Sequence, residues 1–156
     1  AVKAPTLVLD NGIRLMDSSL ILSYFEAQAA PGRKLLPVAP DALASDLQTL
    51  GFILVAGEKA VQNVYEYNLR PAEKQHNPWI ARITTQLLAA CREWNRLLEE
   101  RPAAAVPDQV AVTSTVIWTF IQSTIPHVVH AGDFNHIRSV AELFETHSAF
   151  KKHPFS

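Results

Sequence analysis

The pattern of apolar and polar residues changes after residue 30. Before that point, short apolar runs are interrupted by turn-forming residues, whereas after residue 40 the apolar residues recur at helical spacing. Side chains repeat on one face about every two residues in a strand and about every 3.6 residues in a helix. The pattern therefore predicts a short N-terminal region that contains strands, followed by a longer region that is helical.

A hairpin is predicted at the start of the chain. Thr6–Leu9 and Ile13–Met16 are short runs dominated by β-branched and apolar residues. Asp10-Asn11-Gly12 separates them, and Asn-Gly is a strong hairpin signal because both residues tolerate a positive φ. Two strands form at best a marginal sheet in water, so we expect the hairpin to be part of a larger unit.

A helix and a linker are predicted to follow the hairpin. Asp17-Ser18-Ser19 carries side chains that cap helix N-termini, and apolar residues follow at helical spacing. The hairpin and this helix together account for residues 5–29. Residues 30–40 contain three prolines and a glycine, a composition typical of a linker.

Further helices are predicted from the linker to the end of the chain. We expect helices at about 41–69 and 78–101, and a last amphipathic helix around 137–144. The stretch 108–123 is apolar nearly all round, so its helix is expected to be central and buried. In the helix predicted at 41–69, the apolar residues form a stripe near one face: Leu43, Leu47, Leu50, Leu54, Val61, Val64 and Tyr65.

A series of short motifs, in this order and spacing, resembles the glutathione transferases, in particular their bacterial members. The matching segments are Lys3-Ala4-Pro5-Thr6-Leu7, Asp10-Asn11-Gly12, Asp17-Ser18, Ile21-Leu22-x-Tyr24, Leu35-Leu36-Pro37, Arg70-Pro71-x-x-Lys74 and Ser148-x-Phe150. The resemblance implies a mostly α fold. A partial thioredoxin-like α/β domain would occupy residues 1–29, a linker 30–40 and an all-α helical bundle 41–156.

The sequence departs from that family in two places. The family's thioredoxin-like domain opens with a β-α-β unit, which this sequence lacks, so we expect the natural protein to continue upstream of Ala1. The residue that activates the glutathione sulfur lies in that unit, and the catalytic residue is therefore unknown here. The family also opens its buried helix with Ser/Thr-x-x-Asp. This chain has Val106-Pro107-Asp108-Gln109, where either Pro107 is the first helical residue or Asp108 is the cap, and helix nucleation is expected to be weaker.

The resemblance implies that the protein is an enzyme that conjugates glutathione to a small hydrophobic electrophile, or runs a related glutathione-dependent thiol reaction. Glutathione would be a co-substrate, with no other cofactor, and the active protein would be a homodimer. One alternative is a non-enzymatic binding or regulatory protein on the same fold, because fold does not fix function. Another is a helical interaction module that has no glutathione site.

The same resemblance assigns glutathione-binding roles to two short segments of the chain. The Ala4 backbone beside a cis Pro5 would pair with the cysteinyl backbone, and Lys3 would approach the glycyl carboxylate. Ser18 would hold the γ-glutamyl carboxylate at a helix N-terminus, while Asp17 meets its amino group. The plainer alternatives are a trans proline at a strand start, an ordinary N-cap and a solvated lysine.

Tyr67, Tyr65 and Trp118 lie where the family builds its electrophile pocket, although core packing is the safer interpretation of Trp118.

Four residues, His127, His130, Asp133 and His136, fall within a short span, but the span contains Pro126 and Gly132 and is expected to be a loop, not a metal site. Cys91 falls in a helical apolar stripe and is expected to be a buried core thiol.

The composition of the chain further limits the classes of partner that we expect. Fourteen Lys and Arg residues stand against fifteen Asp and Glu, for a formal net charge of -1, so neither a nucleic acid nor an anionic membrane is expected as a partner. The single cysteine forms no internal disulfide, and no apolar run is long enough to span a bilayer. We therefore expect a cytoplasmic protein.

Overall fold

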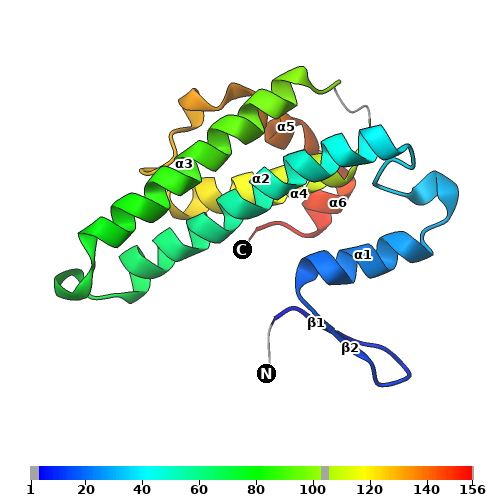
Figure 1. Cartoon of the computed structure of the whole chain (residues 1–156), viewed down its shortest axis with the longest axis horizontal. Helices are drawn as coiled ribbons and strands as arrows, with labels where there is room; N and C mark the ends of the chain where they lie inside the picture. The colour runs from blue at the N-terminus through cyan, green and yellow to red at the C-terminus, as the bar shows by residue number, and fades with distance from the viewer. Residues whose placement is uncertain (1–3, 103–105, 156) are drawn as a thin grey trace. The chain divides into compact units, whose positions relative to one another are not determined.

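The computed structural model describes residues 4–102 and 106–155 (Figure 1). The chain divides into two compact units, Ala1–Pro37 and Val38–Ser156. The first contains a two-stranded sheet and one α-helix, and the second contains helices only, within the described residues. No helix in these ranges combines the length and the apolar character that crossing a membrane requires.

The first unit opens with the expected hairpin. Strands β1 (Thr6–Val8) and β2 (Arg14–Met16) pair in antiparallel register, with Thr6 opposite Met16. The turn is tied by two backbone bonds, from the Leu9 N–H to the Ile13 carbonyl (2.9 Å) and from the Gly12 N–H to the Leu9 carbonyl (2.8 Å).

The hairpin turn differs in type from the expected one. Gly12 has φ +84, but Asn11 does not adopt a positive φ. The loop is therefore a three-residue connection whose last residue is left-handed, instead of a two-residue turn with two such residues. The Asn11 side chain explains the choice, because its Oδ1 accepts from the Ile13 N–H at 3.1 Å and holds Asn11 in a local turn.

Helix α1 (Ser18–Gln28) completes the first unit and is followed by a 3-10 turn, η1 (Pro31–Arg33). Glu26 near the end of α1 accepts from the backbone N–H groups of Leu35 and Leu36, both at 3.1 Å. One carboxylate thus satisfies two backbone donors of the following segment and fixes the path of the chain as it leaves the helix.

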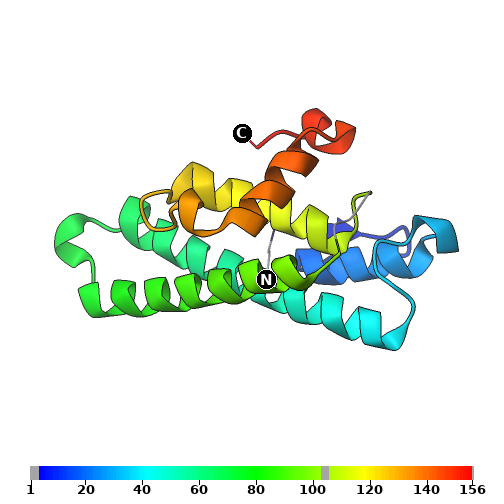
Figure 2. The same cartoon turned by 90° about the horizontal axis from the view of Figure 1, so that it is seen from above.

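The second unit is built on two long helices that run side by side in opposite directions, α2 (Pro40–Val64) and α3 (Asn77–Glu100), as Figures 1 and 2 show. Helix α4 (Gln109–Thr124) packs on α2, and α5 (Asn135–Glu145) packs on both α3 and α4. The remaining short elements are the π-helical turn η2 (Tyr65–Leu69), the 3-10 turns η3 (Ala72–Lys74) and η4 (Ala131–Asp133), and helix α6 (Ser148–Lys152).

The core of this unit is centred on α3. Trp94 is fully buried and donates its indole N–H to the Ser114 hydroxyl at 3.1 Å. Ile83, Leu87, Cys91 and Leu98 of the same helix are also buried, whereas Ile80 and Leu97 are half-buried. Burial of α4 is less complete than expected, because Val116 is exposed while Trp118 and Ile121 are buried.

The face of α2 that enters the core is not the predicted apolar stripe. Of that stripe only Leu50 is buried, whereas Leu47, Leu54, Val61 and Tyr65 are exposed. Besides Leu50 and Ile53, the buried face carries small and polar residues: Asp46, Thr49, Ala56, Gly57, Ala60 and Asn63. Small side chains let α4 approach closely, since a Cβ on Gly57 would lie 2.9 Å from Cδ1 of Ile117.

The start of α4 resolves the alternatives that the sequence left open. Asp108 is the N-cap, and its Oδ1 accepts from the Ala111 N–H at 2.8 Å. Its other oxygen accepts from Nη2 of Arg101 at 3.0 Å. A charged, hydrogen-bonded cap thus replaces the family's capping box, so the expected weakness of this helix start is compensated by a cap that the neighbouring helix holds in place.

Candidate functional site

The hairpin register brings the beginning of the described chain next to the beginning of α1. Thr6 pairs with Met16, so Pro5 directly precedes the paired part of β1 and Asp17 directly follows that of β2, at the open end of the hairpin. The Ala4–Pro5 peptide bond is cis, as predicted.

Asp17 occupies an unusual backbone conformation at this point. Its φ is 79 and its ψ 128, and it is the one non-glycine residue with a positive φ in the described ranges. Such a conformation is costly for a residue with a Cβ, and strained residues cluster at functional sites. The side chain compensates in part, because Oδ1 accepts from the Ser19 N–H at 2.9 Å and caps α1.

Ser18 is the first residue of α1, and its side chain is exposed. Its N–H is one of the helix-start donors that no turn of the helix can satisfy, and within the described residues neither this N–H nor the hydroxyl has a hydrogen-bond partner. The positive end of the helix dipole lies at the same place. These features make the position suited to a carboxylate.

The structure describes one of the two other predicted glutathione contacts, Ala4, but not Lys3. The backbone of Ala4 lies at the edge of the hairpin and is exposed. Lys3 lies outside the described residues. Ala4 and Pro5 directly precede β1, and Asp17 and Ser18 directly follow β2, so the four residues flank the same open end of the hairpin.

The three aromatic residues predicted for an electrophile pocket lie in two settings. Tyr65 and Tyr67 are exposed in the π-helical turn η2, and Tyr67 meets His127 edge-on, with ring centroids 5.4 Å apart. Trp118 is only 4% exposed and packs between Trp94 and Phe134, with centroid separations of 6.2 and 6.1 Å. Trp118 thus belongs to the core, which is the alternative that the sequence favoured.

The histidine-rich span and Cys91, the other candidates from the sequence, show no sign of a reactive or metal-binding role within the described residues. His136 lies 3.9 Å from a Glu99 carboxylate oxygen, and His127 packs on Tyr67. No three His, Cys, Asp or Glu side chains of the described residues come together as a metal ion would need. Burial raises the pKa of the Cys91 thiol to about 12, despite the opposing charge of Arg92. Cys91 is therefore not a thiolate at neutral pH and is unsuited to nucleophilic chemistry.

Glu26, near the other end of α1 from this site, has a role that motif reasoning missed. It holds the backbone that follows α1, yet its role depends on contacts nine and ten residues along the chain. A lone acid inside a helix carries no such signal in a sequence. The only available hint was that it precedes a proline-rich segment whose backbone donors needed partners.

Comparison with known proteins identifies the fold. No profile of a protein family matches the chain, and no curated protein matches its sequence. Solved structures do match. A glutathione S-transferase from Methylobacterium radiotolerans, in complex with glutathione sulfonate, superposes with a TM-score of 0.86 at 20% identity, over 99% of this chain and 73% of that chain.

Two more structures show the range of the likeness. A glutathione transferase family member from Pseudomonas fluorescens, with bound S-(propanoic acid)-glutathione, gives a TM-score of 0.85 at 22% identity, over 96% of this chain and 75% of the other. Maleylpyruvate isomerase from Pseudomonas aeruginosa gives 0.72 at 16% identity, over 95% and 78%. With a likeness of this extent covering both units, the chain has the fold of the glutathione transferases.

Proposed function

We propose that this protein binds glutathione at the start of α1 and uses it as co-substrate in a transferase reaction. The observation that carries the proposal is the strained cap at Asp17, which directly precedes the exposed Ser18 at the open end of the hairpin. Structures with the same fold that contain glutathione derivatives support it.

Each group at this end of the hairpin matches a part of the peptide. The Ser18 N–H and hydroxyl would donate to the γ-glutamyl carboxylate at the helix N-terminus. The Asp17 carboxylate would accept from the α-amino group of the same residue. The Ala4 backbone would pair with the cysteinyl backbone in the manner of an added strand. Lys3 stays a proposed partner for the glycyl carboxylate.

The reaction proposed is conjugation to a small hydrophobic electrophile. The sulfur must be a thiolate to attack, and an ordinary thiol with a pKa near ~8.5 supplies little thiolate at neutral pH. The present residues would bind and orient the peptide, and no residue of this chain is assigned to sulfur activation. Tyr65 and Tyr67 are the proposed contacts for the electrophile. A glutathione-dependent isomerase is a second candidate, because the maleylpyruvate isomerase structure is among the matches.

Glutathione binding is tested by thermal unfolding with and without the peptide. A ligand at about 100 times its Kd stabilises the native state by roughly 2.7 kcal/mol, so the melting temperature should rise clearly. Ser18→Ala should lose most of this rise. Ser23→Ala is the matched control, because Ser23 is an exposed serine of the same helix whose hydroxyl donates to the Ser19 carbonyl. An equal rise in all three proteins would show that the Ser18 hydroxyl takes no part in binding.

Catalysis is tested separately by turnover with an aryl halide. In this reaction the C–S bond forms, halide leaves and the thiol proton is released, so both the thioether and the halide ion can be measured. Turnover above the uncatalysed rate supports a transferase. Binding without turnover would favour the non-enzymatic alternative while leaving the glutathione site intact.

A further inference from the structure

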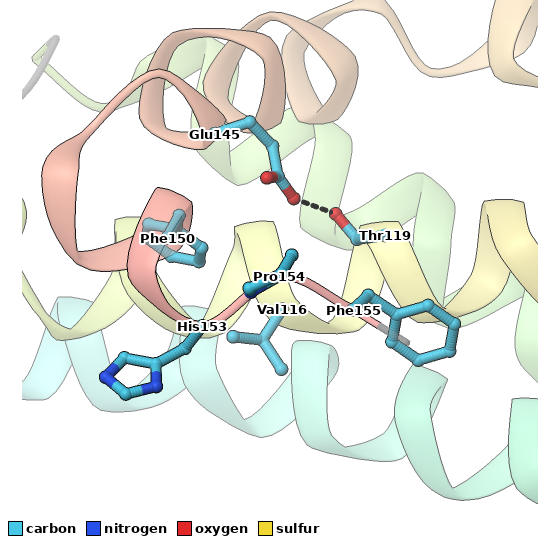
Figure 3. A pocket seen from close by; sticks show the side chains of 7 residues that line it. All are labelled: Val116, Thr119, Glu145, Phe150, His153, Pro154 and Phe155. Atoms are coloured by element: carbon cyan, nitrogen blue, oxygen red, sulfur yellow. Dashed lines mark hydrogen bonds between the residues drawn. The ribbon is translucent and has the colours of Figure 1, made fainter.

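A pocket of about 340 Å³ lies in the helical unit where the end of the described chain passes over α4 (Figure 3). Helix α4 contributes Val116 and Thr119, and α5 contributes Glu145. The rest of the wall comes from α6 and the residues after it: Phe150, His153, Pro154 and Phe155. None of these side chains has a role in the glutathione site, which belongs to the other unit.

The polar side of the pocket carries one carboxylate. Glu145 is the one acidic residue among the described residues that line it; His153 is the one basic residue, and neither lysine nor arginine lines it. The Thr119 hydroxyl donates to Oε1 of Glu145 and fixes the carboxylate, as the dashed line in Figure 3 shows. Oε2 has no donor within the described residues, so an oriented acceptor remains available to a ligand.

The other side of the pocket is apolar and aromatic. Figure 3 shows the Phe150 and Phe155 rings on either side of Pro154, with Val116 close to them. Phe155 is 54% exposed and is held edge-on against Phe120, with centroids 6.3 Å apart. Exposed phenyl rings offer apolar area to a flat ligand and a negative ring face to a cation.

We propose that this pocket binds a small aromatic molecule that carries a protonated amine. The ammonium group would donate to Oε2 of Glu145, and the ring of the ligand would pack against Phe150 and Phe155. The volume of the pocket is within the range of small-molecule sites and large enough for one ring with a short side chain. Neutral aromatic molecules would bind more weakly, and aromatic carboxylates more weakly still, because their charge would face that of Glu145.

The probe is 2-phenylethylamine, titrated into the glutathione-free protein by calorimetry, with 3-phenylpropanoate as an anion of similar shape. We expect saturable binding of the amine and at least about tenfold weaker binding of the carboxylate, as for the gain or loss of one charged hydrogen bond. No binding of the amine, or equal affinity for amine and carboxylate, would overturn the proposal. The titration contains no glutathione, so its outcome is independent of the proposed function.

Single-residue variants test whether the amine binds in this pocket. Glu145→Gln should weaken the amine by about tenfold and bring it close to the affinity of 2-phenylethanol. Glu142→Gln is the matched control, because Glu142 is an exposed acid of the same helix that does not line the pocket. Phe155→Ala should weaken both amine and alcohol. Both Glu145 and Phe155 are exposed, so these variants should fold normally. Equal loss in the two glutamate variants would reduce the effect to net charge and contradict the assignment.

Discussion

Arg101 joins three helices of the helical unit through two carboxylates. At the end of α3, it donates to both oxygens of Asp46 on α2, at 3.1 and 3.0 Å, and to the Asp108 cap of α4 at 3.0 Å. Burial alone would lower the pKa of Arg101, but its hydrogen bonds and the charges of Asp46 and Asp108 outweigh this and raise the pKa. The two acids would repel each other without the guanidinium between them.

Replacing Arg101 should therefore be costly. We expect Arg101→Met to lower the free energy of unfolding by about 3 kcal/mol, because it leaves a buried Asp46 unpaired. Arg96→Met is the control, since Arg96 also contacts two acids but is exposed on the same helix, and it should change stability little. Denaturant unfolding of both variants measures the difference, and equal losses would show that Arg101 is only a surface ion pair.

Cys91 gives a second prediction at this scale, with a defined pH dependence. The thiol ionises near 9.0 when unfolded, while its pKa in the folded protein is about 12, so the unfolded state loses its proton first as the pH rises. This residue should therefore lower stability progressively between those two values. Iodoacetamide at pH 8 should label the unfolded chain readily and the native protein very slowly. Rapid labelling of native protein would place the thiol at the surface.

Single-residue roles were predictable where they rest on local chemistry. The cap at Asp17, the cis bond at Pro5 and the buried thiol at Cys91 all follow from neighbours in the sequence or from motif resemblance. Arg101 could not be assigned, because its partner Asp46 is 55 residues away and only the packing of α2 against α3 brings them together. Glu145 and its pocket were equally hidden.

At the scale of elements, α2 shows where periodicity misleads. Its larger apolar residues form a stripe, and we expected a stripe of that kind to face the core. The helix instead buries mostly small and polar residues, because the close approach of Ile117 on α4 leaves no room for a large side chain at Gly57. Helix positions and ends were predicted well from prolines and caps, whereas the choice of face depended on the shape of the partner helix.

Two glycines of α2 test this packing. Gly51 is exposed, and nothing lies within 4 Å of the position that a Cβ would take there, so Gly51→Ala should stabilise the protein by about 1 kcal/mol through helix propensity. At Gly57 the same methyl would meet the end of the Ile117 side chain, so the gain should be smaller. Gly57→Leu should destabilise by about 1–3 kcal/mol. Tolerance of leucine at both positions would show that the contact of α2 with α4 is loose.

Variants of Asp108 separate two contributions to stability at the start of α4: the N-cap hydrogen bond and the ion pair with Arg101. Asp108→Asn keeps an acceptor for the Ala111 N–H but removes the charge that faces Arg101. Asp108→Ala removes both and should cost about 1 kcal/mol more than Asp108→Asn, the usual value of an N-cap. The comparison is made by thermal unfolding. If the two variants melt together, the cap contributes nothing and the ion pair carries the whole effect.

For the whole molecule, the exposed stripe of α2 supports the proposed homodimer. Leu47, Leu54 and Val61 are spaced by heptads and all exposed. An apolar helix stripe of this kind is typical of a surface that packs against a second copy in a symmetric pair. We expect light scattering at tens of micromolar to report a dimer and Leu54→Glu to shift it to monomer. Leu143→Glu, at an exposed leucine of α5, is the control and should leave the dimer unchanged.

The fold of the whole chain could be anticipated from motif order, but the activity could not. The hairpin formed where its sequence predicted it, and a solved glutathione S-transferase structure matches the fold over 99% of this chain. The electrophile depends on side chains that no motif specifies. Trp118 illustrates this, because only the packing around α4 placed it between Trp94 and Phe134.

The most direct test of the account is a calorimetric cycle with two peptides and two proteins. Glutathione is compared with cysteinylglycine, which lacks the γ-glutamyl group, in the wild type and in Ser18→Ala. If the start of α1 holds the γ-glutamyl carboxylate, the wild type should prefer glutathione by at least about tenfold, and Ser18→Ala should lose most of that preference. The same preference in both proteins, or no binding of glutathione by the wild type, would contradict the central claim.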